Sequence, residues 1–135
     1  MSEFILEMFT PQKQFFLDKA ESFVCSSVNG ELCVLAGHQH MLVALEPGEV
    51  RLKVKGQVKH AYVADGFVEI RPDRVMVFSH ICEWPEDIDE VRASLAIEKE
   101  KEQLRNTESL SEHRRSEIEL QRMMAMLKVK NKNRI

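Results

Sequence analysis

The sequence predicts an α+β protein, with a domain of short β-strands over residues 1–84 followed by a helical hairpin over residues 85–135. All five glycines lie before Pro85, so turns are concentrated in the first part of the chain. Charged residues number 19 in residues 1–84 and 22 in the shorter second part, where helix formers dominate. In the first part, short segments of alternating apolar and polar residues also indicate β-strands.

In residues 1–84, apolar and polar side chains alternate over short segments that end at turn signals. Phe4, Leu6 and Met8 share one side of the first segment. The spacing of roughly 8–12 residues between turns favours an antiparallel β-sandwich or a barrel. A parallel sheet is disfavoured, because no interval is long enough for a crossover helix. The expected strands lie within residues 4–10, 22–28, 41–45, 49–54, 57–63, 67–70 and 75–81.

Residues 85–135 predict two helices. Pro85 and the acidic residues after it favour a helix start. The pair Ser109 and Glu112 has the spacing of a capping box and predicts the start of the second helix. The apolar stripe of the first helix is expected to consist of Ile88, Val91 and Leu95.

The second helix carries a methionine-rich apolar face. Packing against a neighbouring helix explains such a face, and an adaptable surface that docks on different partners is the alternative. Both helices have narrow stripes, so the hairpin must pack on the β-domain, on its own partner helix or on another protein. The face consists of Leu120, Met124 and Leu127, with Ile118 and Met123 nearby.

Composition excludes several classes of function. A net charge of −3, with the two signs intermixed, predicts no binding to nucleic acid or anionic lipid. The longest apolar run, Met41–Leu45, is far short of the ~20 residues of a membrane helix. The N-terminus lacks the basic segment of a secretory signal. Three cysteines without C-x-x-C spacing favour a reduced compartment and buried thiols, so a soluble intracellular protein is expected.

The stretch Asn29–Leu42 raises the question of a zinc site, because it places a cysteine and two histidines within eight positions. The spacing C-x4-H-x-H matches no common zinc pattern. Cysteine catalysis at Cys33 with His38 as base lacks both a thiolate-stabilising neighbour and an acidic orienter. We therefore expect no metal and no catalytic residue, and interpret the stretch as a docking loop with exposed polar turns. The rejected zinc donors are Cys33, His38 and His40, with Cys25 or Cys82 as a fourth.

The same stretch carries a resemblance. The segment GELCVLAGHQHMLVALEPGEVRLK resembles the signature GELGVLPGHAPLLTALKPG-x-x-R of the epsilon subunit of bacterial F-type ATP synthases, called delta in mitochondria. The segments FILEMFTPQKQFF, DGFVEIRPDRVMV and EDIDEVRAS agree in order and spacing, so the resemblance covers about the whole chain. The chain keeps Glu31, Gly37 and His38. It departs from the common family residues at Cys33 (Gly), Ala36 (Pro), His40 (Pro) and Asp65 (Gly).

The resemblance implies a ten-stranded β-sandwich with two C-terminal helices, in a non-catalytic subunit at the foot of the rotating central stalk. Such a subunit is expected to be held by the gamma subunit and to rest on the membrane-embedded c-subunit ring through Glu31, Gly37 and His38. It would couple proton or other ion flow to ATP synthesis at the cytoplasmic face of the bacterial membrane, without inserting into lipid. An extended hairpin is expected to reach the catalytic alpha and beta subunits and to block ATP hydrolysis.

An alternative class stays open, since a β-domain with a helical hairpin also suits a cytosolic protein-binding adaptor unrelated to ATP synthase. Co-purification with a multisubunit ATPase would separate the two.

A nucleotide site is also implied. The segment IDEVRA, residues 88–93, matches the motif I/L-D-x-x-R-A with which some family members bind a regulatory ATP. Lysine at Lys99 keeps a charge but loses the bidentate fork of the arginine found there in those members. Met126, also an arginine there, offers phosphate nothing. No cofactor is required, and weak ATP binding is predicted; the Asp89–Arg92 spacing equally suits a helix-stabilising salt bridge. The carried-over residues are Glu83, Asp89, Arg92, Lys99 and Arg122.

Overall fold

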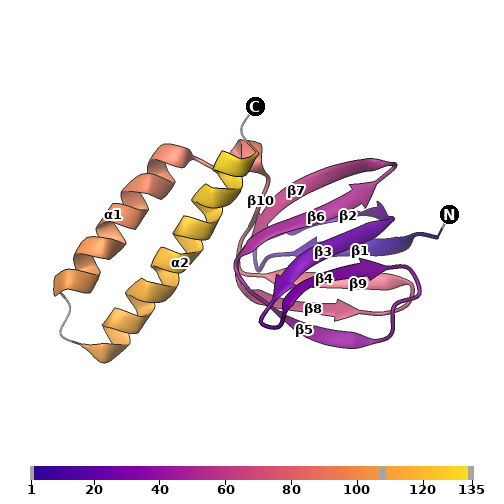
Figure 1. The fold of residues 1–135 in the computed structure, drawn as a ribbon, viewed down its shortest axis with the longest axis horizontal. Coiled ribbons are helices and arrows are strands. Elements are labelled where there is room, and N and C mark those ends of the chain that lie inside the picture. The colour runs from indigo at the N-terminus through magenta and orange to yellow at the C-terminus, as the bar shows by residue number, and fades with distance from the viewer. Residues whose placement is uncertain (1, 107–108, 134–135) are drawn as a thin grey trace.

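A computed structural model describes residues 2–106 and 109–133 and has two parts, a β-domain and a helical hairpin (Figure 1). Helix α2 lies between α1 and the β-domain (Figure 1). The predicted α+β architecture, with strands followed by a hairpin, is confirmed. The described strands are β1 (Phe4–Phe9), β2 (Gln14–Ala20), β3 (Ser22–Ser27), β4 (Gly30–Leu35), β5 (Met41–Leu45), β6 (Gly48–Val54), β7 (Gln57–Val63), β8 (Gly66–Ile70), β9 (Arg74–Ser79) and β10 (Cys82–Glu83). The helices are the 3-10 turn η1 (Pro85–Asp87), α1 (Glu90–Asn106) and α2 (Leu110–Lys132).

The strands form one sheet in the order β10-β7-β6-β3-β5-β8-β9-β1-β2, with β4 paired to β3. Neighbouring strands in the described sheet are antiparallel except for β1 and β9, which run parallel. The predicted antiparallel architecture is confirmed, and this pair is its one parallel exception among the described strands. It needs no crossover helix, because the seven strands between β1 and β9 themselves form the connection.

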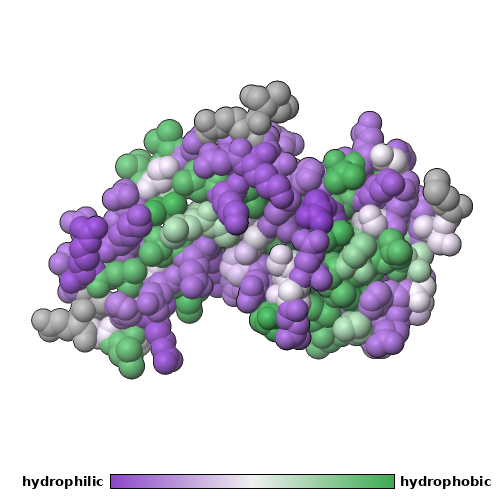
Figure 2. Space-filling view, viewed as in Figure 1, coloured by the Kyte–Doolittle hydropathy of each residue, from purple (hydrophilic) through white to green (hydrophobic). Residues whose placement is uncertain are grey.

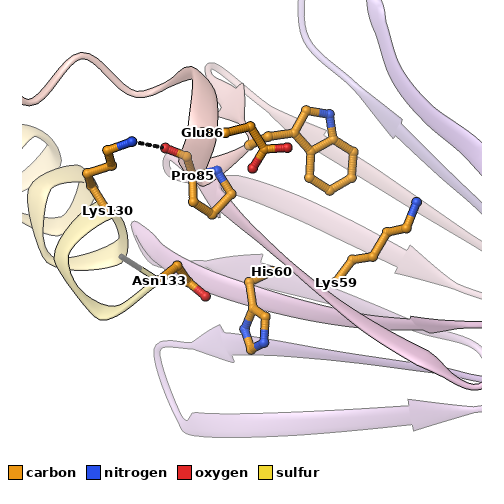
Figure 3. A pocket seen from close by; sticks show the side chains of 7 residues that line it. Lys59, His60, Pro85, Glu86, Lys130 and Asn133 are labelled. Carbon is orange, nitrogen blue, oxygen red and sulfur yellow. Dashed lines mark hydrogen bonds between the residues drawn. The ribbon is translucent and has the colours of Figure 1, made fainter. Parts of the chain in front are cut away.

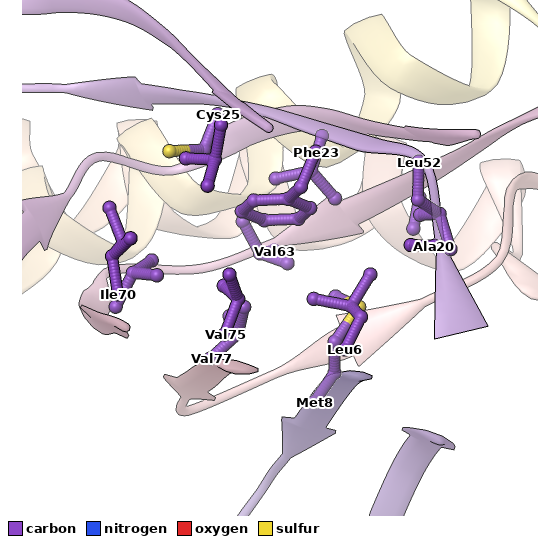
Figure 4. Close-up of a cluster of buried hydrophobic side chains, with 14 of the residues drawn as sticks. Leu6, Met8, Ala20, Phe23, Cys25, Leu52, Val63, Ile70, Val75 and Val77 are labelled. Carbon is purple, nitrogen blue, oxygen red and sulfur yellow. The ribbon is translucent and has the colours of Figure 1, made fainter. Parts of the chain in front are cut away.

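The main core lies where the sheet folds over, and side chains from opposite layers point toward one another there (Figure 4). In β1, Phe4, Leu6 and Met8 are buried and alternate with more exposed residues, as predicted. Phe23 of β3 and Leu52 of β6 meet them from the facing layer (Figure 4). The main core is therefore built within residues 4–84 and contains no hairpin residue among its buried members.

The first helix begins later than predicted, and its predicted apolar stripe is wrong. Pro85–Asp87 form the 3-10 turn, and the Asp89 carboxylate then accepts the backbone N–H of Arg92 at 3.1 Å, which caps α1. Ile88 is buried but precedes the helix. Val91 and Leu95 are 68% and 65% exposed, while the buried residues of α1 are Ala93 and Ile97.

The second helix begins as predicted, since the Ser109 hydroxyl accepts the backbone N–H of Glu112 at 3.4 Å. Its predicted apolar face is only partly right. Ile118 and Met124 are about half exposed, whereas the side chains buried on α2 include Met126 and Val129. Helix α2 packs on the β-domain through these two residues, so the buried face is rotated away from the predicted one.

A second, smaller group of buried residues, the hairpin cluster, joins α2 to the β-domain. It consists of Tyr62, Ala64, Ile88, Met126 and Val129. Over the described residues, no helix combines the length and apolar character that a membrane span requires.

Candidate functional site

The β4 edge holds the first candidate site. Glu31, Cys33 and Leu35 alternate along β4 with their side chains exposed, while Val34 is buried. Within the described sheet, β4 pairs with β3 on one side and has no strand on the other. The Glu31 carboxylate accepts a hydrogen bond from the Arg51 guanidinium at 3.0 Å. This edge therefore presents a row of side chains to a partner.

The loop after β4 is fixed by its backbone. Gly37 has φ +83°, a conformation that favours glycine, and its N–H donates to the Pro72 carbonyl at 2.8 Å. The His38 N–H donates to the Leu35 carbonyl at 3.3 Å. His38 Nδ1 lies 2.8 Å from the Gln39 carbonyl, which can only accept, so Nδ1 carries the proton. The loop holds His38 in one orientation.

Glu31 and His38 lie near opposite ends of β4 and not in one cluster of loops. Extended strand runs from Glu31 to Leu35, which corresponds to roughly 13 Å at the usual rise of a strand, and the chain then turns at Gly37 before His38. A partner that touches both must therefore lie along the β4 edge.

The cysteines depart from the expectation of buried thiols at one position. Cys33 is exposed because the alternation of β4 places it on the outer side, whereas Cys25 and Cys82 are buried. Burial raises the pKa of both buried thiols to about 11. Within the described ranges, no group of three or more His, Cys, Asp or Glu residues could hold a metal ion.

The contact between α2 and the β-domain holds the second candidate site. Arg122 Nε and Nη2 donate to Asp65 Oδ1 and Oδ2 at 2.7 and 3.0 Å, a bidentate ion pair. Arg122 Nη1 donates to Glu119 Oε1 at 2.7 Å. The hydrogen bond from Arg122 holds the pKa of Asp65 below its ordinary value. The Tyr62 hydroxyl donates to the Arg122 carbonyl at 3.0 Å, which fastens the backbone of the same turn.

Glu49 joins the end of α2 to β6. Its carboxylate accepts from Lys132 Nζ at 3.0 Å and from Asn133 Nδ2 at 2.9 Å. His60 Nδ1 lies 3.3 Å from Glu49 Oε1. Burial raises the pKa of Glu49, but the hydrogen bonds from Asn133, Lys132 and His60 outweigh it, so that the pKa is lowered overall.

A hollow opens beside Glu49 between β7, η1 and the end of α2 (Figure 3). Lys130 Nζ donates to the Pro85 carbonyl at 2.9 Å across it (Figure 3). Lys59 Nζ lies 5.9 Å from the centroid of the Trp84 ring. Lys130 thus joins the end of α2 to η1, and Lys59 contacts Trp84 within the β-domain.

The residues assigned to ATP are distributed over the hairpin and its junction. Asp89 caps α1 through the backbone of Arg92, and this contact takes the place of the expected side-chain salt bridge. Glu83, Lys99 and Arg122 line three different hollows. Burial raises the pKa of Glu83, with Asp87 adding to the effect. The docked hairpin does not bring these three side chains into one common hollow.

Sequence reasoning missed Asp65 and Glu49 as contacts of the hairpin. Asp65 drew notice only as an acidic residue in place of a common glycine. An arginine on a helix that packs on another part of the chain requires a carboxylate partner when it is partly buried. Arg122 on a partly apolar helix was therefore the signal in the sequence for such a contact. Which carboxylate meets it, 57 residues away, depends on the tertiary fold.

The comparisons with known proteins agree with this architecture. Residues 3–85 match the family model described as ATP synthase, Delta/Epsilon chain, beta-sandwich domain. The ATP synthase epsilon chain of Ruminiclostridium cellulolyticum is 37% identical over 134 residues, covering 99% of this chain and 100% of that protein. That of Caldicellulosiruptor bescii is 34% identical over 134 residues, covering 99% and 98%.

Two solved structures share the fold at low identity. A chain of the Euglena gracilis mitochondrial ATP synthase, in an OSCP/F1/c-ring structure, has a TM-score of 0.80 at 19% identity, covering 93% of this chain and 80% of its own. A chain of the Tetrahymena thermophila mitochondrial ATP synthase, in a central stalk/c-ring structure, has a TM-score of 0.68 at 14% identity, covering 96% and 97%.

The first part of the chain thus has the β-sandwich fold of delta and epsilon chains, and the second is the helical hairpin that follows it. With relatives above 30% identity over nearly its whole length, the chain belongs to the ATP synthase epsilon chain family. It is a non-catalytic subunit of that complex.

Proposed function

We propose that the chain works in the central stalk of a bacterial F-type ATP synthase, at the cytoplasmic face of the membrane, and helps to couple ion flow to ATP synthesis. We further propose that its hairpin inhibits ATP hydrolysis. The observation that carries this proposal is the separation of the main core from the hairpin cluster. A stiff β-domain can transmit torque while the hairpin leaves it, because no buried residue of the main core belongs to the hairpin.

The ring-facing surface is proposed to be the β4 edge with Glu31, Gly37 and His38. Its exposed side chains and its backbone-fixed loop support a contact with the polar loops of the c-subunit ring. Because Glu31 lies near the start of β4 and His38 follows its end, the proposed contact runs along β4.

The gamma subunit is proposed to dock on a different surface, the aromatic ladder of Phe9, Phe67 and Phe78. Phe78 stacks on Phe67 at 4.8 Å and on Phe9 at 5.3 Å between ring centroids, and Phe67 is 45% exposed. Leu42 on the neighbouring β5 is 71% exposed, and Figure 2 shows hydrophobic residues gathered over this part of the β-domain. Such a hydrophobic patch suits contact with a permanent protein partner better than it suits contact with the polar loops of the ring.

The gamma assignment is tested by Phe67→Ser. We expect it to weaken capture of the chain by the gamma subunit about tenfold, as for an interface aromatic. Leu17→Ser on β2 is the matched control, since Leu17 is 55% exposed and lies outside the ladder. Equal loss of capture in both variants would remove the ladder from the proposal.

We propose that any ATP binding on the hairpin is weak. Arg122 already donates to two carboxylates, and Met126 is buried in the hairpin cluster. Phosphate would have to displace Asp65 or Glu119 before it reached the guanidinium. Calorimetric titration of the chain with ATP tests this, and micromolar affinity would contradict it.

The inhibitory role is tested by ending the chain at Trp84 in the assembled synthase. The shortened subunit should fold, since it contains the main core, and the complex should keep ion-coupled synthesis while hydrolysing ATP faster. If the complex instead loses the coupling of ion flow to ATP synthesis, the hairpin is needed to build the stalk and does not act as an inhibitor of hydrolysis.

A further inference from the structure

We propose that the Asp65 carboxylate keeps the hairpin docked on the β-domain by binding the Arg122 guanidinium. No ligand from outside the chain needs to bind Arg122 for the hairpin to stay docked. The regulatory meaning of the docked state rests on the proposed function. The docking contact itself can be measured on the isolated chain.

All three nitrogens of the Arg122 guanidinium take part in hydrogen bonds. Each of its three nitrogens donates to a carboxylate oxygen at 2.7–3.0 Å, two to Asp65 and one to Glu119. The Arg122 side chain is 17% exposed and the Asp65 side chain 47% exposed, so the pair is shielded on the Arg122 side while water and salt reach it from the Asp65 side. Glu119 lies on the same helix as Arg122, three residues before it, and stays with the hairpin wherever the hairpin goes. Asp65 joins the Arg122 guanidinium to the β-domain, while the Tyr62 hydroxyl reaches only the Arg122 backbone carbonyl, at 3.0 Å.

The β-domain presents Asp65 on a rigid turn. The Asp65 carbonyl accepts the His80 N–H at 3.4 Å. The next residue, Gly66, packs so closely on β9 that an added Cβ would collide with the Phe78 carbonyl. Ser79 Oγ lies 3.0 and 2.8 Å from the carbonyl oxygens of Ala64 and Ile81 and shares its one hydroxyl proton between them, which fastens the other side of the turn. The carboxylate is therefore positioned before the hairpin arrives, which lowers the entropic cost of forming the pair.

A second anchor fixes the direction of α2. Glu49 holds Lys132 and Asn133 at the end of the helix, ten or more residues from Arg122 and roughly 15 Å along the axis. Lys132 is 59% exposed and makes a single contact with this carboxylate, so its contribution is smaller than that of the bidentate arginine. The Asp65–Arg122 pair is the bidentate ion pair among the described contacts of α2 with the β-domain, and we expect docking to depend on it.

The experiment measures how often the hairpin leaves the β-domain in the full chain. Cys33 is exposed and Cys25 and Cys82 are buried, so Cys33 serves as one spin-label site and Ser111→Cys on exposed α2 as the other. Pulsed electron–electron distance measurements then separate docked from released chains. We expect Asp65→Asn, which keeps the shape and removes the charge, to raise the ratio of released to docked chains about tenfold.

The matched control is Glu69→Gln. Glu69 forms an ion pair with Arg71 at 2.8 Å, but both residues belong to the β-domain, so this variant loses an ion pair without touching the hairpin. It should leave the distances unchanged. Reversing the pair, with Asp65→Arg and Arg122→Asp together, should restore docking relative to Asp65→Arg alone. An unchanged released population in Asp65→Asn, with protected β-strand amides showing that the variant is folded, would overturn the proposal.

Assays of ATP hydrolysis in the assembled synthase separate this inference from the proposed function. If both hold, Asp65→Asn should slow hydrolysis because it frees the hairpin, whereas ending the chain at Trp84 should accelerate it. Release of the hairpin without any change in hydrolysis would refute the inhibitory role and leave the Asp65 contact standing. Faster hydrolysis on truncation, with no release in Asp65→Asn, would refute the Asp65 contact alone.

Discussion

The β-domain and the hairpin are held in place by different forces. The main core draws buried side chains from every strand layer, and many of its members are fully buried. In the hairpin, by contrast, α1 buries Ala93 and Ile97 over 17 residues, and α2 docks through the five-residue hairpin cluster and a few polar contacts. The buried apolar area of the main core is exposed only when the β-domain unfolds. The individual hydrogen bonds and ion pairs that hold α2 can be replaced by contacts with water or a partner one at a time. The difference suits a stiff body that carries a detachable arm.

The largest expected effect comes from the main core. Phe23 is fully buried, and Phe23→Ala should lower the free energy of unfolding by about 3–5 kcal/mol because it leaves a cavity that the sheet cannot close. Denaturant titration followed by Trp84 fluorescence measures this, since Trp84 packs on the main core and stacks on Phe15. Ile97 is buried on α1 and is no member of the main core, so Ile97→Ala should destabilise the hairpin and shift this transition of the β-domain by less than about 0.5 kcal/mol if the two regions unfold separately. Equal shifts would mean that the two regions unfold as one unit.

A somewhat smaller effect is expected at the turn beside Asp65. An added Cβ at Gly66 meets the backbone of Phe78, which cannot move without breaking the pairing of β8 with β9. Gly66→Ala should therefore cost about 1–3 kcal/mol of unfolding free energy, as overpacking does. Gly48→Ala is the control, because nothing lies within 4 Å of the added Cβ. The two variants are compared by thermal unfolding.

Acid should affect the hairpin before the β-domain. The pKa of Asp65 is lower in the docked state than its ordinary value of 3.8, so its contribution to docking is fully present above that value and is lost as pH falls through the docked-state pKa. Glu49 changes in the same direction, from 4.5. The groups facing Asp65 are Arg122 and His80; those facing Glu49 are His60, Lys132 and Asn133. Asp65→Asn should flatten this pH dependence in the distance measurement, and an unchanged curve would contradict it.

The smallest effects are expected at the cysteines. Cys33→Ser should change stability by less than about 0.5 kcal/mol, because the side chain is exposed on an edge strand. Thiol reagents should modify Cys33 in the folded chain and spare Cys25 and Cys82, which are buried with raised pKa values. A chelator should leave the thermal midpoint unchanged, whereas loss of a structural zinc would lower it strongly.

The sequence predicted most of the strands and missed β2, β4 and β10. In β2 the exposed and partly buried residues do not alternate, and the strand is held by backbone pairing to β1. The two-residue β10 is too short to leave a pattern, and β4 was interpreted as part of a docking loop because its glycine and polar ends resemble turns. The parallel pairing of β1 and β9 joins residues about 70 positions apart, and no local signal encodes such a pairing.

For the hairpin, local chemistry predicted the cap at Ser109 but not the buried faces. A helical stripe can be assigned only when the first residue of the helix is known, and the capping carboxylate of Asp89 moved that start past Ile88. Of the candidate sites, the loop around Gly37 and His38 was proposed from its motif, and its contact with a partner stays a prediction. The Asp65–Arg122 contact depends on how α2 lies against the sheet and could not be predicted from spacing.

The parallel pair of β1 and β9 also sets an order of events during synthesis. Ile5 pairs with Arg74, so the first strand of the nascent chain lacks one of its neighbours until residues 74–79 have left the ribosome. At roughly 5–20 residues per second, this leaves the strand waiting for several seconds. Contacts so distant in sequence fold slowly, and the apolar face of β1 stays exposed meanwhile. The hairpin emerges last and therefore meets a β-domain whose strands are already complete.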